Sequence, residues 1–348
     1  MRARFRHIFF FLGLAAVTGC KLVDEDMSDC ETDYTLDYEL RLVTNMTAEL
    51  QTRLSLAADV KVATALQSYL NGVFTDFAHD VDLNFYDVVE DEPSGDSLRL
   101  HHEAHVMDAN QSSYTLYIPV HRYMHLAVAN IEDNGVVSFE NGNLCHGASL
   151  TQGIQDTLPS QKTGLFSARL PMDIKEGEDQ EFNVRLFMAN CASALVVDTQ
   201  DCSIRDMRVF ADGFATDYSL CDSVYHFRHS PKIRADQVEV KDSPVLCFAT
   251  VNFPSRDVEP TKTVIQIDNP DVEETSEGAV WRYYVYVTLP DGTVTESILG
   301  VFTALPAGYL KIIKVKVLDN GAVQTSDPLV GVSVTLDWEP GQEYVVPF

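Results

Sequence analysis

Positive charge is scarce in this chain of 348 residues: 25 lysines and arginines stand against 52 acidic residues, for a formal net charge of −27. A surface this acidic repels phosphate backbones, so we expect no nucleic acid partner. The sequence also lacks the GxGxxG, GxxxxGK[ST], GxSxG and HExxH motifs. Paired carboxylates are possible among so many acids, but no pair stands out. We therefore expect no enzymatic activity and no cofactor.

Cysteine is also sparse, with seven residues and no CxxC spacing. This pattern argues against a zinc ribbon or a thioredoxin-like motif. Cys191 and Cys247 lie in apolar, strand-like runs, which favours buried free thiols. Cys30 and Cys145 lie in polar, loop-like surroundings, and we predict a disulfide between these two.

Near its start the chain has an apolar run that is too short to cross a bilayer as a helix. Arginines precede this run, and the sequence Val-Thr-Gly-Cys follows it, so residues 1–19 read as a secretory signal peptide. The exit resembles the bacterial lipobox, which implies cleavage between Gly19 and Cys20 and a lipid on Cys20. The alternative is an ordinary secreted protein. Residues 20–33 are polar and acidic and read as a tether.

Most of the chain alternates apolar and polar residues, the period of half-buried β-strands. The pattern is clear at Leu36–Leu42 and Val81–Asp87, and Trp281–Leu289 is a further strand-like run. One stretch, Val62–Phe77, instead has apolar residues at steps of three and four, which predicts a helix ending near Asn71-Gly72. Ser138–Pro159 is rich in turn-forming residues and is interpreted as long loops.

Many short strands between turns, with one helix, predict a mainly all-β chain of β-sandwich type. An acidic patch with a glycine, residues 173–179, is the best candidate for a domain boundary. We therefore expect an N-terminal β-domain over residues 34–175, which holds the helix, and a C-terminal β-domain over residues 176–348.

Two groups of residues are candidates for binding a ligand, and each also has a purely structural explanation. On a strand, His101, Glu103 and His105 share one face, as a zinc site needs, but an exposed hairpin end explains them equally well. The tyrosines at 283, 284 and 286 form either a sugar-stacking platform or an ordinary strand divided between core and surface. The plainer explanation is preferred for both, so we expect no metal.

The lipobox, the acidic tether ending in Ser28-Asp29-Cys30, the alternating first strand, the helix, and the strands Val81–Asp87 and from Phe182 together resemble the FimB-like fimbrillin-associated anchor lipoproteins of type V pili. This resemblance implies two tandem transthyretin-like β-sandwiches. It also implies an outer-membrane, outward-facing lipoprotein with a fatty acid such as palmitate on Cys20. The role would be that of an anchor or accessory subunit of the fimbria in cell adhesion, with fimbrial pilin subunits as partners.

Subunits of such pili join by strand addition, in which an extended segment completes a neighbour's sheet. The candidate segment is C-terminal, and its apolar residues are Val330, Val332, Val334, Leu336, Tyr344, Val346 and Phe348. The alternative for Val330–Leu336 is the last strand of its own domain. The alternative function is that of a surface glycan-binding lipoprotein built from the same sandwiches.

Overall fold

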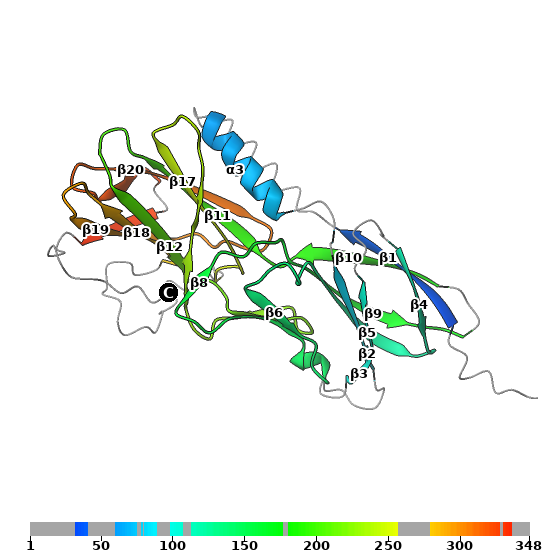
Figure 1. Cartoon of the computed structure of the whole chain (residues 1–348). Coiled ribbons are helices and arrows are strands. Elements are labelled where there is room, and N and C mark those ends of the chain that lie inside the picture. Colours follow the sequence, from blue (N-terminus) through cyan, green and yellow to red (C-terminus); the bar gives the residue numbers. More distant parts are fainter. Residues whose placement is uncertain are drawn as a thin grey trace, which may run out of the picture.

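Strands make up most of the described chain and gather into four sheets, which Figure 1 shows with a single long helix. This computed structural model describes residues 32–40, 60–74, 78, 80–88, 98–106, 113–176, 180–256, 279–327 and 330–335. The mainly all-β, sandwich-type fold predicted from the strand patterns is confirmed. Among the described helices, none has the length and apolar character that crossing a membrane requires.

The first sheet has seven strands and lies at the right of Figure 1. In spatial order they are β3 (Leu100–Val106), β2 (Val81–Asp87), β5 (Arg122–Ala129), β9 (Phe166–Asp173), β10 (Glu181–Met188), β1 (Thr32–Leu40) and β4 (Ser113–Ile118). Strand β1 is held on both edges, parallel to β10 and antiparallel to β4. Leu83 of β2 and Ile118 of β4 belong to one apolar cluster, so the two ends of this sheet share a core.

Two further sheets lie at the left of Figure 1 and together form a β-sandwich, which we call the second sandwich. One contains β16 (Asp236–Val238), β17 (Val245–Asn252), β11 (Cys191–Asp198), β20 (Leu310–Val317) and β21 (Val323–Thr325). The other contains β22 (Val330–Thr335), β19 (Val294–Val301), β18 (Trp281–Thr288), β12 (Asp206–Asp212), β15 (Lys232–Arg234) and β8 (Thr157–Pro159). Leu195, Val285 and Leu299 meet in the core between these sheets.

Strand β11 is the centre of the second sandwich, with β17 on one side and β20 on the other. Its residues are buried on both faces, since Leu195 lies in the sandwich core and Ala194 lies in the cluster that contains the helix. A strand covered on both faces has no polar face to present. This explains why the segment Ala-Leu-Val-Val is continuously apolar.

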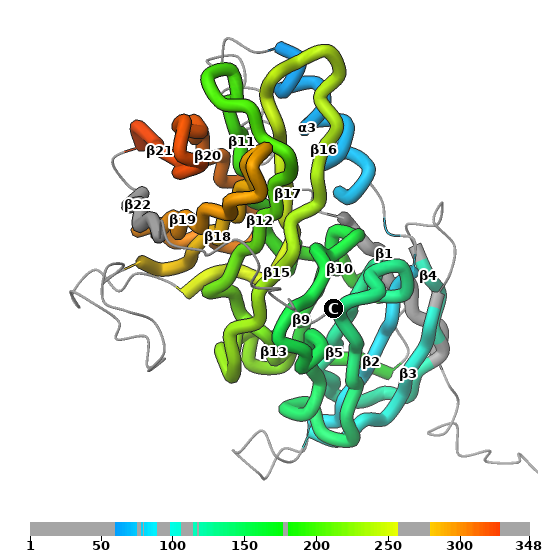
Figure 2. Tube along the Cα trace, turned by 60° about the vertical axis from the view of Figure 1, so that its left-hand side comes forward, coloured from blue at the N-terminus to red at the C-terminus, as the bar shows by residue number. Residues whose placement is uncertain are grey.

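Helix α3 (Val60–Val73) covers the outer face of that same sheet, beside β16 and β17, as Figures 1 and 2 show. It buries Val62, Leu66, Leu70 and Val73, one stripe at helical spacing. Tyr69 Oη donates a 2.7 Å hydrogen bond to Asp236 Oδ2 of β16. The helix was predicted correctly in place and face, but the strands it lies beside, β16 and β17, belong to the second sandwich. The apolar cluster that contains its stripe also continues into the first sheet. The periodicity of the helix fixes which residues are buried and leaves open which sheet buries them.

A fourth sheet consists of β14 (Val224–His226), β13 (Asp217–Ser219), β7 (Ser149–Gln152) and β6 (Val137–Glu140). It packs on the first sheet, because Leu150 shares a cluster with Leu126 and Val128 of β5. The interpretation of 138–159 as loops was therefore wrong: β6, β7 and β8 lie there. These strands have only three or four residues, too few to show a period.

The expected boundary near 175 falls inside the first sheet, because β9 and β10 on either side of it pair with each other. Sheet membership changes later, between Met188 at the end of β10 and Cys191 at the start of β11. Strand β8, which comes before the expected boundary, pairs with β15 of the second sandwich. An acidic patch between two neighbouring strands looks the same in sequence as a linker between domains.

Candidate functional site

The C-terminal strand β22 occupies one edge of the six-stranded sheet and pairs antiparallel with β19 of its own sandwich. The register places Val330 opposite Val301, Val332 opposite Leu299 and Val334 opposite Ser297. All three partners are buried in the sandwich. Strand β22 therefore completes a sheet of its own domain by main-chain pairing with β19. Here the segment is kept as the last strand, as the alternative interpretation had it.

Within the described residues, β22 has one hydrogen-bonded neighbour, so its other edge ends the sheet. Such an edge presents unpaired N–H and C=O groups and is a template for a further strand. The remaining members of the predicted segment, Leu336, Tyr344, Val346 and Phe348, lie outside the described residues. So do Gly19, Cys20 and Cys30.

The opposite end of the molecule has a different kind of edge, strand β3 of the first sheet. His101, Glu103 and His105 are all exposed on one face of it, as the predicted strand requires. His101 lies where the β2–β3 register shifts, between the pairs Phe85–His102 and Tyr86–Leu100. Charged side chains and a bulge are the usual means of keeping an edge strand from pairing, so β3 is a poor template for another chain.

The histidines of β3 turn to different carboxylates and do not converge on one point. His101 Nδ1 lies 3.2 Å from Asp87 Oδ1, and His105 Nδ1 lies 2.7 Å from Asp82 Oδ1. Glu103 instead accepts a hydrogen bond from Asn141. In the described part of the chain, the one group of donors close enough to hold a metal lies elsewhere. A zinc site at His101, Glu103 and His105 therefore has no geometric support.

The three tyrosines of β18 divide between the two faces of their sheet. Tyr283 is fully buried in the sandwich core, where its Oη donates to Ser193 Oγ at 2.7 Å. Tyr284 is 6 % exposed and donates to Asp212 at 2.8 Å, and Tyr286 is half-buried. A sugar-stacking platform needs exposed, coplanar rings. These rings do not provide one.

The structure contains one disulfide among the described residues, between Cys145 and Cys221, whose Cα atoms lie 5.5 Å apart. The predicted pairing of Cys145 with Cys30 was therefore wrong. Cys145 lies in a 3-10 turn (Cys145–Gly147) and Cys221 in the turn between β13 and β14, 76 residues later. Strand β7 follows the first turn and pairs with β13, which brings the two turns together. The missed strands concealed this pairing.

Each cysteine of the disulfide is followed by a polar residue, and these two residues pair as well. His146 Nδ1 lies 3.0 Å from Asp222 Oδ1, and Ser219 Oγ donates to Asp222 Oδ2 at 3.1 Å. The hydrogen bond from His146 holds the pKa of the Asp222 carboxyl below its usual range. In the sequence the four residues form two dipeptides, Cys-His and Cys-Asp. Their separation matches no known motif, so sequence reasoning did not find them.

The free thiols behave as predicted: Cys191 and Cys247 are buried and unpaired, and burial raises the pKa of each. A thiol with a raised pKa is inert at neutral pH.

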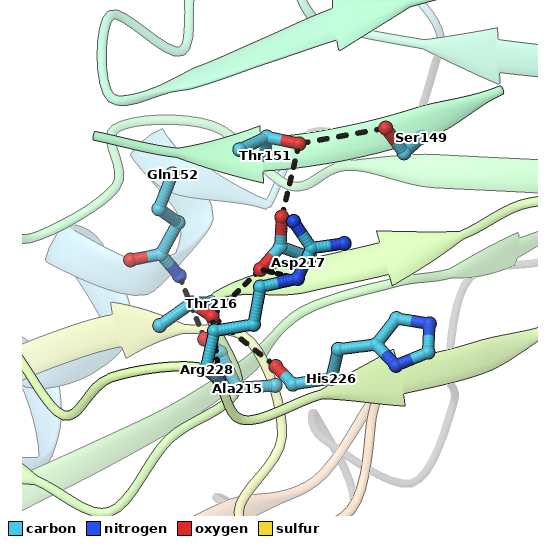
Figure 3. Close-up of polar contacts among 8 residues, drawn as sticks. All are labelled: Ser149, Thr151, Gln152, Ala215, Thr216, Asp217, His226 and Arg228. Atoms are coloured by element: carbon cyan, nitrogen blue, oxygen red, sulfur yellow. Dashed lines mark hydrogen bonds and ion pairs between the residues drawn. The ribbon is translucent and has the colours of Figure 1, made fainter. Parts of the chain in front are cut away.

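A second polar network lies on the four-stranded sheet and is drawn in Figure 3. Asp217, 5 % exposed, accepts hydrogen bonds from Thr216 Oγ1 at 2.7 Å and Thr151 Oγ1 at 3.3 Å. Arg228 Nε lies 3.6 Å from the same carboxylate, and the Arg228 side chain is 72 % exposed. The carboxylate thus has partners from three segments of the chain. We interpret the network as one that stabilises the β13–β14 hairpin.

No protein-family model matches the sequence, and no curated protein matches it either. Solved structures do resemble it. One, described as "a putative adhesin from Bacteroides ovatus", is 11 % identical over 90 % of this chain and 97 % of that chain, with a TM-score of 0.49. Another, described as "putative polysaccharide binding proteins" from Bacteroides thetaiotaomicron, is 9 % identical over 90 % of this chain and 100 % of that chain, with a TM-score of 0.48.

A third is the fimbrial anchor protein Mfa2 from Porphyromonas gingivalis, 11 % identical over 88 % of this chain and 98 % of that chain, with a TM-score of 0.45. All three likenesses extend over nearly the full length of both chains, at low identity and with TM-scores below 0.5.

Proposed function

We propose that this protein is an outer-membrane lipoprotein, held by a lipid on Cys20, that serves as an anchor or accessory subunit of a fimbria. Its part is to bind pilin subunits at the cell exterior, not to catalyse a reaction. The support is the lipobox-like sequence ending at Cys20, the acidic tether and the all-β sandwiches, together with the resemblance described above.

The observation that carries the pilin-binding proposal is the edge position of β22. Because β22 completes its own sandwich, the role we assign to it is that of acceptor: an extended pilin segment adds alongside it. Main-chain hydrogen bonds then supply affinity, and contacts at alternate positions set the register. The charged, bulged edge β3 is the wrong surface for such an addition.

Proline substitutions at neighbouring positions test the acceptor role. Successive N–H groups of an antiparallel strand face opposite sides, so one of Val332→Pro and Ser333→Pro removes an N–H that bonds β19, and the other removes an outward one. Proline is tolerated where the N–H faces outward from an edge. We expect one variant to lose stability and its neighbour to fold normally but lose co-purification of pilin from the producing cell. A normally folded variant that retains pilin would contradict the acceptor role.

Membrane attachment is tested separately with Cys20→Ser. We expect the wild-type mature chain to carry a fatty-acylated N-terminal residue by mass spectrometry and to fractionate with membranes. The variant should be unacylated and released. Two acyl chains anchor stably where one binds only reversibly, so partial release of a singly acylated form is also measurable. An unmodified N-terminus on the wild-type protein would refute the anchor while leaving the pilin test intact.

The glycan-binding alternative shares the anchor and the sandwiches, so it needs its own measurement. The division of the β18 tyrosines between core and surface removes the platform on which it was based. Retardation of the purified protein in a polysaccharide-containing native gel, with the same gel lacking polysaccharide as control, would revive it.

A further inference from the structure

The Cys145–Cys221 disulfide lies beside His146 and Asp222, two side chains of kinds that can bind a metal ion. The donor atoms of His146, Cys221 and Asp222 all lie within 4.8 Å of one another. Cys145 Sγ lies outside that group of three but is bonded to Cys221 Sγ. An imidazole nitrogen, a carboxylate oxygen and the Cys221 sulfur therefore lie close together, and the Cys145 sulfur is bonded to the last of them. Two turns from distant parts of the sequence supply these atoms.

These four donors match what a tetrahedral zinc site uses. Zinc takes Cys sulfur at about 2.3 Å and His nitrogen or carboxylate oxygen at about 2.0–2.2 Å. Tetrahedral ligands at those lengths lie roughly 3.3–3.8 Å from each other. His146 Nδ1 and Asp222 Oδ1, at 3.0 Å, are already close to that spacing. In the disulfide form a proton joins them, and in a metal site the ion would take its place.

The surroundings also suit a closed, structural site. Cys145 and Cys221 are buried, whereas the side chains of His146 and Asp222 are 37 % and 46 % exposed, so the sulfurs lie beneath the two polar ligands. Ser219 Oγ holds the second oxygen of Asp222, the kind of outer contact that orients a ligating carboxylate. Thiolates favour zinc over calcium or magnesium.

We propose that the dithiol form of this protein binds one Zn²⁺ through Cys145, Cys221, His146 and Asp222, so that the same two turns are joined either by a disulfide or by a metal. A thiol or phosphine reductant supplies two electrons and is itself oxidised; the S–S bond breaks, and two protons complete the two thiols. Zinc binding then releases those two protons, since the thiolate is the ligand.

An exported chain would meet both the conditions that favour the dithiol and those that favour the disulfide. Disulfides persist in oxidising compartments, while newly made chains in a reducing cytosol carry thiols. The proposal is independent of the pilin and membrane roles above. It also separates these two cysteines from Cys191, Cys202 and Cys247, which are buried and belong to no described group of metal ligands.

The test uses the mature chain, oxidised or reduced with a phosphine, titrated with Zn²⁺ against a chromogenic chelator. We expect one zinc per reduced chain and none per oxidised chain. Substituting Co²⁺ for Zn²⁺ should give a sulfur-to-cobalt charge-transfer band with tetrahedral ligand-field intensity.

His146→Ala and Asp222→Asn keep both cysteines and change exposed positions, so they should fold. Loss of a partner that only orients a metal ligand already costs about 10–100-fold in affinity, so loss of a ligand itself should weaken zinc binding by at least about tenfold. His226→Ala, a half-buried histidine on the neighbouring strand β14, is the matched control and should bind as the wild type does. The proposal would be overturned if oxidised and reduced protein bound zinc equally. It would also be overturned if the reduced His146 and Asp222 variants bound zinc as tightly as the reduced wild type. A reduced chain that is unfolded by circular dichroism and stays unfolded when zinc is added would overturn it too.

Discussion

The imidazole of His125 lies flat against the ring of Phe85 in the middle of the first sheet, with ring centroids 4.3 Å apart and an interplanar angle of 15°. His125 is fully buried, and its Nδ1–H donates to the carbonyl oxygen of Asn84 at 3.1 Å. Burial lowers the pKa of His125 from 6.5 to about 4, and the bond to Asn84 only partly offsets this. The fold therefore requires the neutral ring.

Stability should consequently fall with pH below neutrality. Between about pH 6.5 and 4 the unfolded chain binds a proton at His125 that the folded chain excludes, so the free energy of unfolding rises with pH across this window. The shift corresponds to roughly 3 kcal/mol at most. Above the unfolded pKa the contribution is complete, and it is lost as the pH falls towards the folded pKa.

His125→Phe isolates this term, because it keeps an aromatic ring on Phe85 and removes the titration. Denaturant melts at pH 7 and pH 4.5 should show a smaller pH difference for the variant than for the wild type. Asp80 and Asp212, whose pKa values burial raises, titrate in both proteins and cancel in the comparison. Identical pH differences would show that His125 is not the group responsible.

The disulfide should stabilise the oxidised protein mainly by restricting the unfolded chain. For cysteines 76 residues apart, the double variant Cys145→Ser/Cys221→Ser should lose about 2–5 kcal/mol of unfolding free energy. Peptide mapping without reduction should recover one peptide pair containing Cys145 and Cys221. A pair joining Cys145 to Cys30 would refute the connectivity.

The apolar stripe of α3 should account for much of the stability of the second sandwich. Leu66 is fully buried, so Leu66→Ala should cost about 2–5 kcal/mol of unfolding free energy. Val60→Ala, in the same helix at a position 74 % exposed, is the control and should change stability by less than about 0.5 kcal/mol. Comparable losses in the two variants would mean that α3 does not dock on the sheet as described.

The Asp217 network offers a prediction about buried and exposed partners of one ion pair. Asp217→Ala removes the carboxylate that accepts from Thr151 and the nearer of the two acceptors of Thr216, and it should cost about 1–3 kcal/mol. Arg228→Ala removes only the exposed partner and should cost about 0–1 kcal/mol. Thermal melts of the two variants compare their stabilities directly. A loss of stability in Arg228→Ala equal to that in Asp217→Ala would contradict the view that the buried carboxylate is what stabilises the hairpin.

Strand β2 and the helix could be predicted from sequence because each carries a period over seven or more residues. Strand β2 matches its predicted bounds, Val81–Asp87, and the buried residues of α3 are those of the predicted stripe. Strands of three or four residues, such as β7 and β13, carry no such period and are defined by their partners. The Cys145–Cys221 pair depends on the pairing of those strands, so it could not be predicted either.

The position of β1 determines how the protein would respond to tension. Among the described residues β1 comes first, and it is paired on both sides, with β10 from Thr35 to Leu40 and with β4 from Thr32 to Asp37. A pull on the N-terminal end along the strand axis must shear both ladders together, instead of unzipping one bond at a time. In the tethered form proposed above, the load would therefore reach the domain at a strand that is paired on both edges.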